Sequence, residues 1–297
     1  MQTPARRVEH QQTDKGYVPV YTTDVIAQPW DSYSADDHAT WGTLYRRQRD
    51  LLTDRACQEF LAAQDAMGMG ERHIPRFDQL NEVLGAATGW TLIGVEGLLP
   101  ELDFFEHLAN RRFPVTWWIR RPDQIDYIAE PDLFHDLFGH VPLLMDPVFA
   151  DYMQAYGAGG LRAFEQFGAD ALQNLTRLYW YTVEFGLINT PAGLRIYGAG
   201  ILSSAGESHH CLASAIPNRI GFDLERIMRT RYRIDTFQKT YFVIDSFDQL
   251  MKATSADFAP VYQRLQHQET LSAGEIIASD TVLQTGSGDG WSEAGDV

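Results

Sequence analysis

The chain has 297 residues, of which 44% are hydrophobic, and a formal net charge of −16 at pH 7. A chain of this size can bury one large core, and its length allows one or two domains. The acidic excess argues against a nucleic-acid or anionic-membrane partner, because both would repel the chain.

Two cysteines, Cys57 and Cys211, are present without a CxxC pair, which favours a reducing compartment. Arg6 and Arg7 lead into polar residues, whereas an export signal would continue into a hydrophobic segment. No apolar run approaches the roughly 18 residues needed to span a bilayer. We therefore expect a soluble, cytoplasmic protein.

Residues 1–29 are polar and include three prolines, which predicts a flexible N-terminal arm. Ser34 and Asp37 have the spacing of a helix-capping box, and Trp41 and Leu44 follow at helical intervals. This pattern predicts that ordered structure begins near Ser34. Such apolar stripes indicate a buried helix face more often than a cofactor contact.

The later elements are predicted from short apolar runs. Strands are expected over 90–95, 113–119, 194–197 and 241–244, and helices over 101–111, 147–167, 169–186 and 223–229. Strands and helices do not alternate regularly, which argues against a doubly wound sheet. We expect a mainly α fold, that is, α+β with a few short strands. One catalytic domain would cover residues 30–270, followed by an acidic and mobile tail over 271–297.

Two histidines stand five positions apart in the segment FHDLFGH, which covers residues 134–140. On a straight α-helix such positions lie roughly 140° apart, so His135 and His140 could not meet at one ion. Gly139 permits a helix end and Pro142 prevents continuation, so His140 is expected at or past the end of the helix. Asp136 would then point elsewhere and support the site.

Glu184 lies in the aromatic segment 178–185. An unpaired carboxylate there would cost several kcal/mol, or its pKa would rise until it became neutral. A divalent cation removes that cost, and so would pairing with Arg177 or Arg195. Two imidazoles and one carboxylate are the ligand set of non-haem Fe(II) oxygenases, although zinc and manganese accept the same set. The pattern predicts an enzyme.

Three blocks, 131–142, 178–187 and 197–204, resemble the pterin-dependent aromatic amino acid hydroxylases, and the likeness runs from about residue 30 to 255. Within that family the chain is similar to the short bacterial phenylalanine 4-hydroxylases. The resemblance implies a single catalytic domain that converts L-phenylalanine, dioxygen and a tetrahydropterin to L-tyrosine and a hydroxylated pterin at Fe(II).

The resemblance also implies residue roles. His135, His140 and Glu184 match the iron ligands. Arg120 matches the residue that receives the substrate carboxylate, for which a guanidinium offers two parallel hydrogen bonds. The other substrate contacts implied are Asp132, which steadies Arg120, Pro131 and Trp180, which form the walls of the phenyl pocket, and Ser203, which contacts the amino-acid end.

On the pterin side the resemblance implies a loop that hydrogen-bonds and stacks on the ring system. The matching residues are Gly97, Leu98, Leu99 and Phe104 in that loop, and Asp136 and Tyr179 nearby. Glu101 and Pro114 replace a Ser and a His of the animal relatives, and Ile128 replaces a Thr beside the substrate, so these contacts are not inherited.

Several alternatives stay open. Tyrosine or tryptophan hydroxylation is possible within the family, although Ile234 aligns where tyrosine-specific enzymes carry an acid and thus favours phenylalanine. A zinc hydrolase could use the same three ligands, and a binding module could hold a structural metal. The polar arm is too short for a regulatory domain and no heptad repeat is present, so we expect a monomer without phenylalanine allostery.

Overall fold

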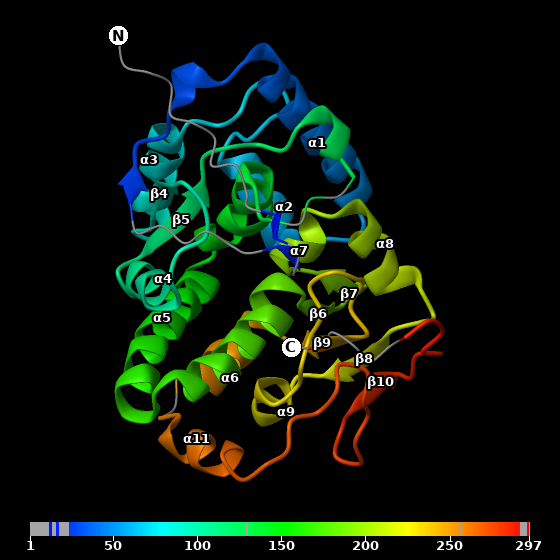
Figure 1. The fold of residues 1–297 in the computed structure, drawn as a ribbon. Helices are drawn as coiled ribbons and strands as arrows, with labels where there is room; N and C mark the ends of the chain where they lie inside the picture. The colour runs from blue at the N-terminus through cyan, green and yellow to red at the C-terminus, as the bar shows by residue number, and fades with distance from the viewer. Residues whose placement is uncertain are drawn as a thin grey trace.

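The structure is a computed structural model that describes residues 12–13, 16–17, 24–126, 128, 130–255, 257–291 and 296. Most of the predicted N-terminal arm lies outside the described residues. The described part is mainly helical with small sheets, as expected from the sequence (Figure 1). None of its helices has the length and apolar character needed to cross a membrane.

The α-helices carry most of the described chain. In order they are α1 (Ala35–Leu52), α2 (Gln58–Ala66), α3 (Phe77–Ala87), α4 (Glu101–Ala109), α5 (Pro147–Phe167), α6 (Ala169–Tyr179), α7 (Ala199–Leu202), α8 (Ala205–Ala213), α9 (Leu224–Met228), α10 (Phe247–Thr254) and α11 (Ala259–Leu265). The predicted start of α1 is confirmed: the Asp37 backbone N–H donates to the Ser34 hydroxyl, and the Ser34 N–H donates to the Asp37 carboxylate.

Two sheets flank the helices, apart from a two-residue pairing of β1 (Gln12–Thr13) with β2 (Gly16–Tyr17). The first sheet has the order β3 (Val25–Ile26), β4 (Thr91–Val95) and β5 (Arg112–Thr116), with β4 and β5 parallel. The second has the order β10 (Val282–Gln284), β8 (Asn218–Gly221), β9 (Thr240–Ile244), β6 (Leu187–Thr190) and β7 (Gly193–Ile196). The four predicted strands are present as β4, β5, β7 and β9, whereas β3, β6, β8 and β10 of these two sheets were not predicted.

The helix predicted over 169–186 is not one α-helix. The chain follows α6 to Tyr179 and then widens into a π-helix, η5 (Trp180–Glu184). The predicted helix end near His140 is also wrong: a second π-helix, η3 (His135–His140), runs directly into the 3₁₀-helix η4 (Val141–Met145). A π-helix is rare and has no strong composition signal, so apolar periodicity alone does not predict it.

Gly139 has a different role from the expected one. It lies inside η3, and a Cβ on it would come within 2.7 Å of the Ala199 carbonyl oxygen at the start of α7. The glycine therefore allows η3 and α7 to pack closely, backbone against backbone.

The segment 271–297, which was expected to be an acidic and mobile tail, contributes the strand β10 to the second sheet, and its mobility stays a prediction. β10 pairs with β8 in antiparallel fashion, and Figure 1 shows this red segment alongside β8. Two buried cations explain the placement, because each needs an acid for charge compensation. Asp280 pairs with Arg226 at 2.8 Å, and Asp296 pairs with Lys239 at 3.1 Å.

Candidate metal centre

The two π-helices bring the three predicted metal ligands together. In a π-helix, residue i bonds to residue i+5, so residues five apart become neighbours. The Val141 N–H accordingly donates to the Asp136 carbonyl at the end of η3. The Nε2 atoms of His135 and His140 face each other at 3.1 Å.

Glu184, the last residue of η5, closes this arrangement. Its Oε1 lies 3.1 Å from His140 Nε2 and its Oε2 lies 3.6 Å from His135 Nε2. Burial raises the pKa of the Glu184 carboxyl, but the two imidazoles outweigh this effect and hold the pKa below its usual value. Among the described residues the ion-pair partners of Glu184 are these two histidines. Neither Arg177 nor Arg195, the alternative partners considered from the sequence, forms an ion pair with it there.

The spacing fits one metal ion. Two ligand atoms bound at right angles at the roughly 2.1 Å of a metal–imidazole bond would lie about 3 Å apart. The donor set of two imidazole nitrogens and one carboxylate is the facial triad of non-haem Fe(II) sites. Burial lowers the pKa of His135 to about 4, so this imidazole is neutral at pH 7 and its ring is in the form that binds metals.

Ser203 contacts the Nδ1 atom of His135, on the other side of the ring from the Nε2 atom that faces His140. His135 Nδ1 is 2.9 Å from the Ser203 hydroxyl, which donates its own proton to the Ala199 carbonyl at 2.9 Å. The hydroxyl must therefore accept from Nδ1–H, which leaves the Nε2 lone pair directed at the metal position. The expected contact of Ser203 with a substrate stays a prediction, and the contact that the structure shows is with a metal-ligand candidate.

Replacing Ser203 by Ala should lower metal affinity roughly tenfold or more, because such supporting partners typically contribute 10–100-fold. Competition with a chelator, followed by metal analysis, measures this. Ser214→Ala is the matched control, because the Ser214 hydroxyl accepts from the Ile216 N–H in a loop that carries none of the candidate ligands. Equal metal affinity in both variants would contradict the supporting role.

Asp136 is a second acid at this centre, and its carboxylate lies within 4.8 Å of ligand atoms of both histidines. It accepts from the Thr116 backbone N–H at 2.7 Å. Burial raises its pKa to about 7, although His140 opposes the shift. The Thr116 N–H already occupies one Asp136 oxygen, whereas the two Glu184 oxygens face the Nε2 atoms of the two histidines. The geometry therefore favours Glu184 as the third ligand and Asp136 as a support.

Arg120 and Asp132 form a buried ion pair next to His135. Nε and Nη2 of Arg120 donate to the two Asp132 oxygens at 2.9 and 2.8 Å, and Asp132 also accepts from the backbone N–H groups of Arg120 and His135. Burial raises the pKa of Asp132, but the bonds from Arg120 outweigh it and keep the pKa low. Within the described residues Nη1 of Arg120 has no hydrogen-bond partner, which leaves one edge of the guanidinium for a second carboxylate.

The residues predicted to line the substrate and pterin sites lie on the segments that carry the candidate ligands, with Trp180 at the first residue of η5 and Glu184 at its last. The Trp180 ring stacks on Tyr232 with a centroid distance of 4.3 Å, and Pro131 is half-buried on the segment that carries Asp132. On the other side, Tyr179 stacks on His140 at 6.2 Å and meets Phe104 edge-on at 5.6 Å.

The predicted pterin loop adjoins Phe104. Gly97, Leu98 and Leu99 are half-buried between β4 and α4, the helix that carries Phe104. The structure thus places these residues on one segment with Phe104, and their contact with a pterin stays a prediction.

Glu207 is a buried acid that no sequence pattern had indicated. It accepts from the Gln238 backbone N–H at 3.1 Å and from the Tyr241 hydroxyl, and burial raises its pKa to about 7. Ser204 caps α8 through the Glu207 N–H, so the sequence pattern resembles an ordinary capping box with an exposed acid. Only the tertiary fold turns this side chain inward.

This raised pKa predicts a pH dependence of stability. The folded protein holds the Glu207 proton up to about pH 7, whereas an unfolded chain releases it near pH 4.3. The free energy of unfolding should therefore fall as pH rises between these values, by on the order of 3 kcal/mol from this group. Glu207→Gln should flatten the profile, as measured by urea unfolding at pH 5 and pH 7.5. An unchanged slope would contradict the assignment.

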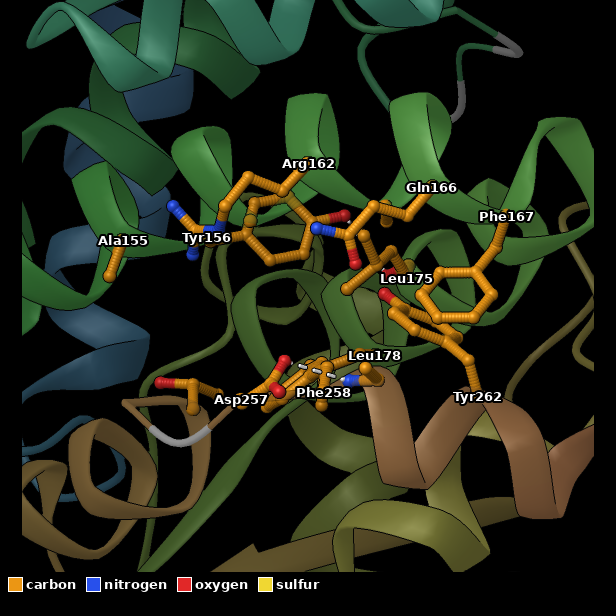
Figure 2. A pocket seen from close by; sticks show the side chains of 14 residues that line it. Ala155, Tyr156, Arg162, Gln166, Phe167, Leu175, Leu178, Asp257, Phe258 and Tyr262 are labelled. Carbon is orange, nitrogen blue, oxygen red and sulfur yellow. Dashed lines mark hydrogen bonds between the residues drawn. The ribbon is translucent and has the colours of Figure 1, made fainter.

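A separate cavity of about 70 Å³ lies between α5, α6 and α11. Figure 2 shows Tyr156, Phe167 and Tyr262 turned toward it, with Arg162 and Asp257 at its borders. None of the predicted site residues lines this cavity, so it is not part of the candidate metal centre.

Comparisons with known proteins agree with this geometry. A family model described as "Biopterin-dependent aromatic amino acid hydroxylase" matches residues 18–281. The chain is 63% identical to a phenylalanine-4-hydroxylase of Ralstonia nicotianae, covering 92% of this chain and 86% of that protein, and 62% identical to one of Chromobacterium violaceum, covering 92% and 91%. A crystal structure of the Chromobacterium violaceum phenylalanine hydroxylase bound to iron and phenylalanine superposes with a TM-score of 0.84 at 60% identity, covering 91% of this chain and 97% of that one.

Proposed function

Because the chain belongs to the biopterin-dependent aromatic amino acid hydroxylase family, we propose that it is a phenylalanine 4-monooxygenase, which converts L-phenylalanine to L-tyrosine with dioxygen and a tetrahydropterin. The observation that carries the proposal is the meeting of His135, His140 and Glu184, with the Arg120–Asp132 pair directly beside them. The family and the phenylalanine hydroxylases at 62–63% identity support the reaction and the use of iron and a pterin.

His135, His140 and Glu184 would hold the Fe(II) ion. When bound, the ion and the tetrahydropterin together supply the activation of dioxygen for hydroxylation of the aromatic ring. His135 is held neutral by burial and oriented by Ser203, so its Nε2 lone pair is available without a proton being displaced. Glu184 would supply a negative charge to the ion, and a set of three ligands from the chain is typical of sites that keep positions open for other ligands.

The substrate's amino-acid end would bind at Arg120. Asp132 holds the guanidinium plane fixed through two side-chain bonds, so the free edge is pre-organised for a carboxylate. Because Asp132 also accepts from the His135 N–H, the carboxylate site and the metal site share one anchor. This shared anchor would orient the phenyl ring toward the metal, against Trp180 and Pro131.

The pterin would lie on the side of Phe104 and Tyr179. These rings meet edge-on, and Tyr179 also stacks on His140, so they offer an apolar surface next to the candidate ligand. Asp136 is a buried carboxyl that can donate a hydrogen bond when protonated. The loop of Gly97, Leu98 and Leu99 would contribute backbone hydrogen bonds, because a glycine lets the main chain approach a planar ligand.

Assays with phenylalanine, tyrosine and tryptophan side by side test the substrate assignment. We expect preferred turnover of phenylalanine, with oxygen uptake that requires both Fe(II) and a tetrahydropterin. Preferred turnover of tyrosine or tryptophan would assign another member of the family. Activity that survives replacement of iron by zinc, without pterin or oxygen, would instead support the hydrolase.

We also propose that the protein acts as a monomer in the cytoplasm. The two cysteines of the described chain are free and buried, which suits a reducing compartment. Sedimentation with and without phenylalanine should give one species of about 34 kDa. Sigmoidal dependence of the rate on phenylalanine would contradict the absence of allostery.

A further inference from the structure

We propose that Gln238 is a positioning residue for the substrate pocket: it fixes the plane of the Trp180 indole and so determines which aromatic ring the pocket accepts. The inference rests on the proposed function, in which Trp180 is a wall of that pocket. Gln238 lies outside the blocks that indicated the family, and its importance follows from its contacts.

Trp180 needs an external restraint. It is half-buried and stands at the first residue of η5, where the helix widens. Tyr232 stacks on its face at 4.3 Å with an interplanar angle of 20°, and Phe185 packs at 4.7 Å and 36°. Stacking resists tilting of the ring but leaves it able to slide in its own plane. A bond to the indole N–H would remove that freedom.

Gln238 supplies this bond. The Trp180 Nε1–H donates to Gln238 Oε1 at 2.9 Å. The orientation of the amide is determined by its other end, because Nε2 of Gln238 donates to the Arg233 carbonyl at 2.8 Å. A flipped amide would place a donor against the indole donor, so only one orientation satisfies both contacts. Gln238 is 2% exposed, so water does not substitute for it.

The backbone of Gln238 is anchored as firmly as its side chain. Its N–H donates to Glu207 Oε1 on α8, and the Tyr241 hydroxyl on β9 donates to the same oxygen. The surface loop 231–239 otherwise exposes its apolar residues, with Ile234 67% and Phe237 51% exposed. The loop therefore contacts the Trp180 ring face through Tyr232 and its N–H edge through Gln238. The buried Glu207 fixes the backbone of Gln238.

The position of the indole would then determine which aromatic side chain the substrate pocket accepts. With its edge bonded, the indole presents one fixed wall to the ring of the substrate. With the bond lost, the indole can slide, which widens the pocket and weakens the contact with a phenyl ring. Binding of phenylalanine should suffer more than the chemistry of the bound complex, and a bulkier ring should be rejected less strongly.

Gln238→Met tests the idea, because it keeps length and burial while it removes both polar ends. We expect the KM for phenylalanine to rise roughly three- to tenfold, the equivalent of one buried hydrogen bond, with kcat and iron content changed by less than about twofold. The selectivity for phenylalanine over tryptophan should fall. Gln64→Met is the matched control: Gln64 is also fully buried and accepts from Arg49 at 2.9 Å, so it reports the general cost of the exchange and should leave the KM unchanged.

A double-mutant cycle with Trp180→Phe separates positioning from general structure. If Gln238 acts through the indole N–H, Gln238→Met should add little to Trp180→Phe. Additive effects on the KM would overturn the inference. Should the Met variant fail to fold, Gln238→Glu takes its place, since it keeps an oxygen for the indole; a KM near that of the unchanged protein supports the inference, and a rise as large as that of Trp180→Phe overturns it.

The contact can also be tested without turnover. The indole N–H signal of Trp180, identified by its loss in Trp180→Phe, should move to the position of a free indole in Gln238→Met. A signal that does not move overturns the inference even if phenylalanine is hydroxylated. If instead the signal moves but the unchanged protein does not hydroxylate phenylalanine, the proposed function fails and the positioning contact stands.

Discussion

Glu184→Gln should abolish hydroxylation and metal binding together. The substitution keeps the shape of the side chain but removes the negative charge of the carboxylate that faces both histidines. Loss of a supporting partner alone costs 10–100-fold in metal affinity, so loss of a ligand charge should cost more than about 100-fold. Metal analysis after dialysis and a chelator competition measure the affinity, and tyrosine formation measures the activity.

The matched control is Glu225→Gln. Glu225 also pairs with a cation, Arg264, but on the surface, where such a pair contributes little. This variant should retain both iron and activity. If Glu184→Gln bound iron as tightly as the control, the third ligand would have to be Asp136, the other carboxyl within reach of both histidines.

The candidate metal centre could be inferred from the sequence because the types of its residues indicate metal binding. A carboxylate in an aromatic segment needs a partner, and two nearby imidazoles with it indicate a metal. The way in which the chain brings them together was not predictable. Apolar periodicity favours an α-helix for residues 169–186, and the same ideal helix places His135 and His140 on different faces. The π-helices depend on tertiary packing, such as the approach of α7 to Gly139.

The fold, too, has elements that the sequence predicts and elements that depend on tertiary contacts. The predicted strands correspond to β4, β5, β7 and β9, because each contains a clear apolar run. β10 was missed because Val282 and Leu283 are exposed in a polar, glycine-containing segment, and its position depends on the distant cations Arg226 and Lys239. Glu207 was missed for a related reason: a local capping pattern explains the residue fully until the fold buries it.

Arg120→Ala should raise the KM for phenylalanine by about two to three orders of magnitude while iron binding persists. The guanidinium is buried and held by Asp132. Its pair with the substrate carboxylate would be desolvated and hydrogen-bonded, and loss of one partner from such a pair costs roughly 3–5 kcal/mol. Iron should remain, because Asp132 keeps its bond from the His135 N–H.

Two further variants separate binding from folding. Arg121→Ala is the matched control, because this neighbouring arginine is exposed and, within the described residues, forms an ion pair with Asp123 alone. The KM of this variant for phenylalanine should not change. Removal of Arg120 alone also leaves Asp132 buried and uncompensated, which should lower the free energy of unfolding. The double variant Arg120→Met/Asp132→Asn removes both charges and should recover stability but not the KM, since no cation remains for the substrate carboxylate. Recovery of the KM in that variant would show that Arg120 supports the fold and does not bind the substrate.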